Sequence, residues 1–206
     1  MQDDDSEWRN MVALRPETPD DIESIHRVIE AAFCSVKHSD HTEQDIVAKL
    51  RDDIALSVSL VAEKSNQVVG HIAASPVMFD SVEGWFGLGP VSVLPDQQGI
   101  GIGSALIKAA LSQLKKAGAA GVVVLGDPDF YSRFGFKQVP GVYFPGAPAE
   151  YFTVLPFGQE IPAGPLVIIK PFASVKNFRT EFLEALRKTM LRGLKGLRPL
   201  VWCNAC

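Results

Sequence analysis

Glycines stand at alternate positions in the segment Gln98-Gly99-Ile100-Gly101-Ile102-Gly103-Ser104, between an expected apolar strand at residues 88–93 and an amphipathic helix at residues 104–116. The start of a helix carries free N–H groups and the positive end of the helix dipole. Glycines let the backbone close around an anion without interference from Cβ atoms. The segment therefore predicts a phosphate cradle.

Two well-known phosphate motifs do not fit this spacing. A P-loop needs a Lys and then a Ser or Thr directly after its last glycine, whereas Ser104 follows Gly103. A dinucleotide fingerprint needs a third glycine where Ser104 stands and an acidic residue about 20 positions later, where residues 122–125 are apolar. A glycine-rich turn that holds no ligand is the remaining alternative.

A second motif follows the first at a fixed separation. After the helix come an expected strand at residues 121–126 and the pattern Tyr131-x-x-x-Gly135-Phe136. Together with Gln98-x-x-Gly101-x-Gly103, this pattern resembles the GNAT superfamily of N-acetyltransferases, over about residues 12–172. Three phrases are similar to its YhbS-like branch: Val91-Ser92-Val93-Leu94-Pro95, Gly99-Ile100-Gly101-Ile102-Gly103-Ser104-Ala105-Leu106 and Val124-Leu125-Gly126-Asp127-Pro128-x-x-Tyr131.

The resemblance implies a fold and a co-substrate. The fold is a mixed α/β acyl-CoA N-acyltransferase fold, with a central, mostly antiparallel sheet and a parallel pair of strands that splays at the cofactor site. The co-substrate is acetyl-CoA. Its pyrophosphate is expected on the backbone N–H groups of Gln98, Gly99, Ile100, Gly101, Ile102, Gly103 and Ser104. Its pantetheine arm, which carries amide groups, is expected to pair with the strand at Val91, Ser92 and Val93.

The implied reaction moves the acetyl group to a primary amine, which must first lose a proton. Tyr131 matches the family position that protonates the departing thiolate; packing as a plain aromatic residue is its alternative role. The residues do not identify the base. Glu83 ranks first because it precedes the cofactor strand; the other candidates are Asp80, His71, His41, Glu43 and Glu150. A non-catalytic acyl-CoA sensor and transfer of a longer acyl group remain alternatives.

Composition narrows the class of protein. The chain has 206 residues, a net charge of −4 and three cysteines. The odd cysteine count and the lack of a long apolar run or a basic leader favour a cytoplasmic protein. Residues 174–206 contain seven Lys or Arg and two Glu, so the net charge is +5 there and −9 in residues 1–173. An acidic body argues against nucleic acid as a partner, and the histidine and cysteine spacings do not predict a metal.

Three regions are expected along the chain. Residues 1–11 form a disordered acidic N-terminus, residues 12–172 the acetyltransferase domain, and residues 173–206 a basic amphipathic helix with a short tail. The apolar stripe at residues 175–197 favours docking on its own domain or on a partner in a homodimer; contact with a membrane surface is the less favoured alternative. Cys203 and Cys206 lie at the terminus without a second pair.

Periodicity and turn residues predict the remaining elements of the domain. They are a first strand at residues 12–15, a helix around residues 22–32, a helix at residues 43–51, a hairpin of strands 57–63 and 68–76, a helix after the strand at 121–126, and strands at residues 135–139 and 151–155.

Overall fold

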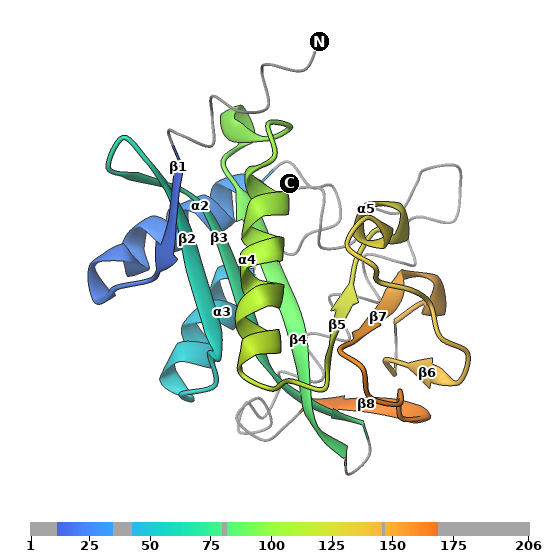
Figure 1. Cartoon of the computed structure of the whole chain (residues 1–206). Helices are drawn as coiled ribbons and strands as arrows, with labels where there is room; N and C mark the ends of the chain where they lie inside the picture. The colour runs from blue at the N-terminus through green and yellow to red at the C-terminus, as the bar shows by residue number, and fades with distance from the viewer. Residues whose placement is uncertain (1–11, 35–42, 80–81, 146, 169–206) are drawn as a thin grey trace.

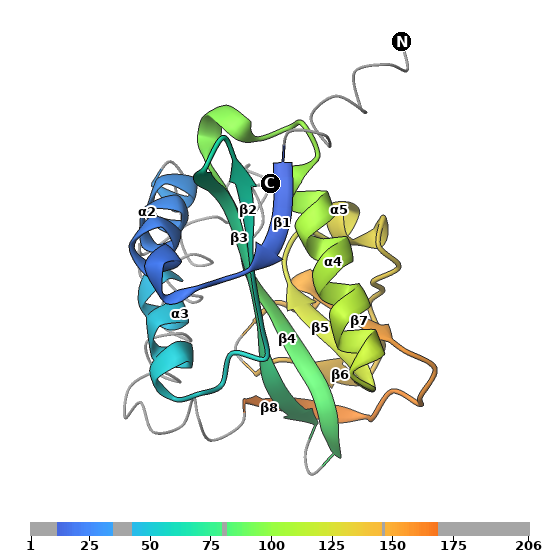
Figure 2. The same ribbon diagram turned by 60° about the vertical axis from the view of Figure 1, so that its left-hand side comes forward.

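The computed structural model describes residues 12–34, 43–79, 82–145 and 147–168. Six strands follow one another across the central sheet in the order β1-β2-β3-β4-β5-β7. In Figure 2, α2 (Ile22–Phe33) and α3 (Glu43–Asp52) cover one face of this sheet, and α4 (Ile102–Lys116) and α5 (Pro128–Ser132) lie on the other side. The protein has the mixed α/β fold that the sequence predicts.

The first half of the sheet is an antiparallel meander, whose four strands lie next to one another in Figure 1. It contains β1 (Val12–Pro16), β2 (Val58–Lys64), β3 (Gln67–Phe79) and β4 (Val82–Val93). Ser65 and Asn66 join β2 to β3 with φ angles of 51° and 62°. Two consecutive left-handed residues match the twist of a two-residue hairpin, which confirms the predicted turn.

The second half of the sheet begins with a change of direction. β4 pairs in parallel with β5 (Gly121–Leu125), and β5 pairs antiparallel with β7 (Phe152–Pro156). A parallel pair needs a crossover connection, which α4 supplies by packing across β2, β3 and β4. Two short strands complete the architecture: β8 (Gly164–Ile168) extends the end of β3, and β6 (Val142–Tyr143) pairs with β8.

The parallel pair is short and the two strands then separate. Register pairs join Trp85, Phe86 and Gly87 of β4 to residues 121–123 of β5, whereas β4 continues to Val93 without a further pair on that side within the described residues. Just beyond Gly87, two residues of β4, Gly89 and Pro90, lie opposite one residue of β3. Such a bulge bends its strand, and here it falls where β4 leaves β5.

Three hydrophobic cores hold the described layers together. One lies between the sheet and α4 and includes Val91 and Val93 of β4 together with Val122 and Val124 of β5. Another lies between the sheet and α2, with Ile25, Ile29 and Phe33 as its largest fully buried side chains. β4 contributes Val91 and Val93 to the core under α4 and Trp85 to a third core, which lies around Phe79 and Phe152.

Some sequence expectations need correction or fall outside the described residues. No strand forms at residues 135–139; Lys137 makes only an isolated bridge to Val154, because Gly135 (φ 92°) turns the chain after α5. β4 begins at Val82, six residues before the expected start. The expected N-terminal segment 1–11 and the expected C-terminal helix and tail at 173–206 both lie outside the described residues. None of the described helices is long and apolar enough to cross a membrane.

Candidate active site

The glycine-rich segment forms the turn between β4 and α4 that the sequence predicts. Gly99 (φ 78°) and Gly101 (φ 99°) both have left-handed backbone. Gly101 is the residue that caps α4, and its carbonyl accepts the N–H of Ala105 at 3.0 Å. Because the first N–H groups of a helix have no partner within it, those of Ile102, Gly103 and Ser104 are available to an anion.

A hollow opens in the surface at this turn. Its walls come from the end of β4, the turn, the first residues of α4 and two side chains of the α5 region: Val93, Gln97, Gln98, Gly99, Gly101, Ile102, Gly103, Ser104, Phe130 and Arg133. Most of the residues expected to bind the cofactor phosphates thus share one hollow. Val91, Ser92 and Ile100 do not line it; Ile100 is partly exposed at the turn.

The side chain of Gln98 has a structural contact. Its Nε2 donates to the backbone oxygen of Val93 at 3.0 Å, which ties the turn to the end of β4. The neighbouring Gln97 accepts a hydrogen bond from Lys64 Nζ at 2.8 Å, so an ammonium group lies next to the hollow. Gln98 therefore contributes no charge and holds the turn in place.

The edge of β4 continues from the hollow toward the bulge. Val91 and Val93 point into the core under α4, and Ser92 points toward the α2 face. Ser92 is fully buried, and its Oγ has no hydrogen-bond partner among the described residues. Beyond Gly87, the β5 side of this strand pairs with no described strand, so its backbone groups are free to pair with an extended chain of amides.

Tyr131 lies on α5, directly after β5. Asp127 caps this helix by accepting the N–H of Asp129 at 2.9 Å, and Pro128 occupies its first position. The Tyr131 ring is 1% exposed and packs edge-on against Phe130 and Phe136, with centroids 5.2 and 5.5 Å away. It belongs to the same core as the diverging ends of β4 and β5.

The candidates for the base lie apart from one another. Glu83 is exposed near the start of β4, four residues before Gly87 and thus about 13 Å along the strand from the point where β4 and β5 separate. Glu150 is exposed in the turn before β7, Glu43 is buried at the start of α3, and His71 is fully buried in β3. Asp80 and His41 lie outside the described residues. The structure does not bring Glu83 to the hollow.

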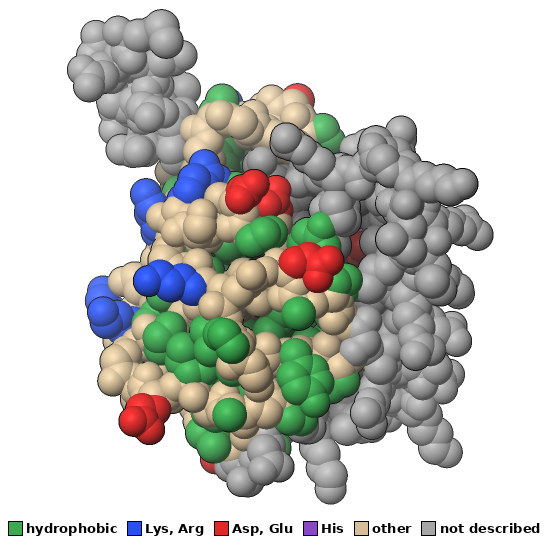
Figure 3. Space-filling view, turned by 90° about the vertical axis from the view of Figure 1, so that its right-hand side faces the viewer, with side chains coloured by type: hydrophobic (Ala, Val, Ile, Leu, Met, Phe, Trp, Pro, Cys, Tyr) green, Lys and Arg blue, Asp and Glu red, His purple; other side chains and the backbone are tan. Residues whose placement is uncertain are grey.

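Arg133 lines the hollow, although the sequence motifs do not single it out. Its guanidinium carbon lies 4.3 Å from the centroid of the Phe130 ring, and its Nε donates to the Phe130 backbone oxygen at 3.1 Å. Figure 3 shows the face that carries α5 and β7, where Lys and Arg side chains gather along one margin and hydrophobic side chains cover much of the remainder. Gln98 is neutral, whereas a site for several phosphates favours a cation. The sequence therefore contained one hint that a cation from another part of the chain lies at the hollow.

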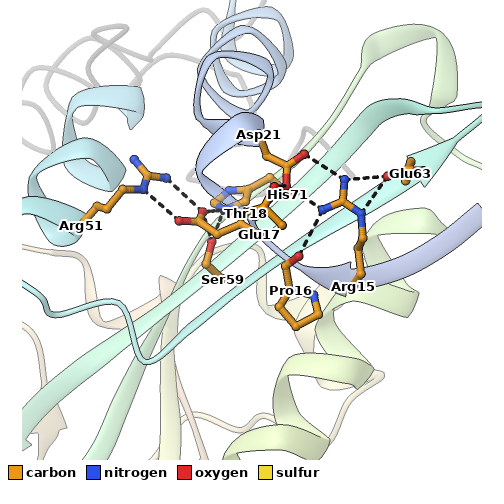
Figure 4. Close-up of polar contacts among 9 residues, drawn as sticks. All are labelled: Arg15, Pro16, Glu17, Thr18, Asp21, Arg51, Ser59, Glu63 and His71. Atoms are coloured by element: carbon orange, nitrogen blue, oxygen red, sulfur yellow. Dashed lines mark hydrogen bonds and ion pairs between the residues drawn. The ribbon is translucent and has the colours of Figure 1, made fainter.

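A second polar cluster lies between the meander and the α2–α3 layer (Figure 4). Arg51 donates to both carboxylate oxygens of Glu17 at 2.9 and 3.0 Å, and Ser59 Oγ donates to the same carboxylate. His71 Nε2 lies 2.9 Å from Ser59 Oγ. Burial lowers the pKa of His71 to about 4, against the opposing effect of the Glu17 charge and with help from Arg51, so the ring is neutral at pH 7.

Comparison with known proteins identifies the class. Residues 55–138 match the acetyltransferase (GNAT) domain. The uncharacterized N-acetyltransferase YhbS of Escherichia coli K12 is 38% identical over 129 residues, which cover 60% of this chain and 72% of YhbS. The chain belongs to the GNAT family of acetyltransferases, and its similarity places it in the YhbS-like branch.

Two solved structures share this fold at higher coverage. A GNAT family acetyltransferase from Brucella melitensis, in complex with acetyl-CoA, is 48% identical with a TM-score of 0.70; the alignment covers 78% of this chain and 97% of that one. Escherichia coli YhbS in complex with CoA is 30% identical with a TM-score of 0.69, covering 79% and 92%. Acetyl-CoA and CoA are therefore ligands of similar proteins.

Proposed function

We propose that this protein transfers the acetyl group of acetyl-CoA to a primary amine of a small molecule or peptide. The observation that carries the proposal is the continuity of two features: the hollow at the start of α4 and the unpaired edge of β4 that leads from it to the bulge. A phosphate group and a chain of amides are the two parts of coenzyme A that such a track fits.

Each group on the track has a role in the proposal. The N–H groups of residues 102–104 bind the pyrophosphate, and the backbone of Val91, Ser92 and Val93 pairs with the pantetheine arm. The Tyr131 hydroxyl gives its proton to the thiolate as the amine attacks the thioester carbonyl and the C–S bond breaks. Glu83 stays a prediction for the base, and the cytoplasmic location stays a prediction as well.

A turnover screen with acetyl-CoA tests the function. We expect release of free CoA with at least one acceptor in a panel of small amines, amino acids, aminoglycosides and peptides, and no release without an acceptor. Tight binding of acetyl-CoA with no turnover on any acceptor would instead favour a non-catalytic acyl-CoA sensor. A protein that does not bind acetyl-CoA would contradict both the acetyltransferase and the sensor hypotheses.

Tyr131→Phe tests the acid on the acceptor that the screen identifies. Because Phe fills the same packed site, affinity for acetyl-CoA should stay nearly unchanged, whereas kcat should fall by roughly 10²-fold, the low end for acid catalysis. A thiol of pKa about 8.5 is already a fair leaving group, so the loss should shrink as the pH rises. Equal turnover at pH 7, with chemistry rate-limiting, would leave Tyr131 a packing residue.

A further inference from the structure

We propose that Arg133 binds a phosphate group of coenzyme A and supplies the positive charge that the Gln98–Ser104 turn lacks. The inference rests on the proposed function, because it concerns the same ligand. It adds a residue from outside the glycine-rich motif, on a different element of the fold.

The hollow needs a cation that its main wall does not provide. Coenzyme A carries a pyrophosphate and a 3′-phosphate, whereas the turn offers only backbone N–H groups and the helix dipole, equivalent to about half a charge. Gln98 is neutral, and its amide is bonded to Val93. Among the residues that line the hollow, Arg133 is the one with a charged side chain.

The guanidinium of Arg133 is held in a fixed orientation. One face lies over the Phe130 ring, its carbon is 5.7 Å from the Phe134 centroid, and Nε is bonded to the Phe130 oxygen. These contacts occupy one face of the guanidinium and its Nε–H group. The two terminal nitrogens form no hydrogen bond with a described residue. Their N–H groups lie in the guanidinium plane, the arrangement that binds phosphate oxygens in pairs.

No neighbouring acid neutralises this charge within the described chain. Asp129 stands four residues before Arg133, a spacing at which helical ion pairs form, yet the two make no ion pair. The backbone N–H of Asp129 donates to the Asp127 carboxylate at 2.9 Å. The guanidinium thus lies beside the hollow, oriented and without a carboxylate partner.

Calorimetric titration with CoA and with dephospho-CoA, which lacks the 3′-phosphate, tests the assignment. Arg133→Gln should weaken CoA binding on the order of ten- to a hundredfold, since a hydrogen-bonded ion pair is lost. The CoA affinity of Arg133→Lys should lie between those of the wild type and Arg133→Gln. Lys keeps the positive charge but cannot bind two phosphate oxygens with paired N–H groups. Lys116→Gln is the matched control: it removes the same charge at the other end of α4, about 20 Å away.

The dephospho-CoA arm identifies the phosphate. If Arg133→Gln weakens dephospho-CoA as much as CoA, Arg133 binds the pyrophosphate; if the loss vanishes with dephospho-CoA, it binds the 3′-phosphate. Both results support the proposal. Equal CoA affinity in wild type, Arg133→Gln and Lys116→Gln would overturn it while leaving the proposed function intact, whereas a wild-type protein that binds no CoA would overturn the proposed function itself. Arg133 is exposed, so unchanged thermal unfolding should confirm that the variants fold.

Discussion

Gly101 combines two requirements at one residue. Its φ of 99° is a conformation that residues with a Cβ rarely adopt, and its position at the cap of α4 places the next three N–H groups at the hollow. The left-handed backbone affects the free energy of unfolding, and the position of the N–H groups affects the affinity for CoA. A substitution at Gly101, measured for both quantities, therefore tests the cradle assignment.

Gly101→Val should cost about 1–2 kcal/mol of unfolding free energy and also reduce CoA affinity strongly, because the turn must reshape to relieve the strain. Gly118→Val is the control, since Gly118 has a similar φ of 82° just past the other end of α4 and open space around its Cβ. Chemical unfolding and calorimetry measure both effects. A folded Gly101→Val protein that binds CoA as tightly as Gly118→Val would contradict the cradle.

Residue types alone carried the cradle prediction but not Arg133. Alternating glycines at a strand-to-helix junction fit an anion site or a turn without a ligand, and the second motif around Tyr131 and Gly135 favoured the anion site. Arg133 lies 30 residues after Gly103 and reaches the hollow only because β5 and α5 return beside the turn. Glu83 shows the converse: it is close to the cofactor strand in sequence, yet its exposed side chain lies toward the other end of β4.

At the scale of elements, periodicity predicted what is long and amphipathic. The stripes of α2 and α4 and the Ser65-Asn66 turn were sufficient for two helices and a hairpin. The first half of β4 was missed because Gly84 and Gly87 lower the strand propensity there, whereas pairing with β3 and β5 stabilises the strand. β6 and β8 depend on pairing with distant strands, which leaves little local signal.

The parallel join between β4 and β5 depends on one missing side chain. A Cβ on Gly121 would lie 2.4 and 2.7 Å from two ring carbons of Trp85 and 2.8 Å from the oxygen of Leu155. Trp85 is 1% exposed and packs edge-on against Phe79 at 5.1 Å, so its ring has no room to move. Gly121 thus leaves room for the Trp85 ring at the first of the three register pairs that join β4 to β5.

Gly121→Ala should therefore destabilise the protein by about 1–3 kcal/mol, the usual cost of overpacking a core. Trp85→Phe removes the clashing part of the ring and should cost stability by itself through a cavity. The double variant should be more stable than the sum of the two costs implies, by at least about 0.5 kcal/mol. Urea unfolding of the wild type, the two single variants and the double variant completes this double-mutant cycle. Additive losses of unfolding free energy would show that the contact between residues 85 and 121 does not constrain the pairing of β4 with β5.

At the scale of the whole molecule, the two faces of the sheet carry different polar features. The α4 face carries the hollow and the unpaired strand edge, whereas the polar cluster of Glu17, Arg51, Ser59 and His71 joins the β1–α2 connection, α3, β2 and β3 (Figure 4). Burial alone would raise the pKa of the Glu17 carboxyl, but hydrogen bonds from Arg51 and Ser59 outweigh it and lower this pKa. We therefore expect this cluster to make the free energy of unfolding depend on pH.

His71 sets the first part of that dependence. Its pKa of about 4 in the folded protein lies below the value of about 6.5 expected in the unfolded chain, so only the unfolded state binds the proton between these values. The free energy of unfolding should be level above pH 6.5 and fall by about 3 kcal/mol as the pH drops to 4. The lowered pKa of Glu17 adds a further loss below about pH 4.5, where the unfolded carboxyl binds protons first.

Urea unfolding at a series of pH values checks this dependence, and two histidine variants isolate the His71 part. His71→Gln cannot titrate, so its stability should be lower at pH 7 but nearly flat from pH 6.5 to 5, the range in which His71 alone among the groups of the cluster is expected to titrate. His26 is exposed on α2, and His26→Gln should retain the wild-type slope, because removing a histidine outside the core leaves the buried ring in place. A wild-type protein whose stability is level from pH 7 to 5, or a His71→Gln variant with the wild-type slope, would show that the buried imidazole does not couple folding to pH.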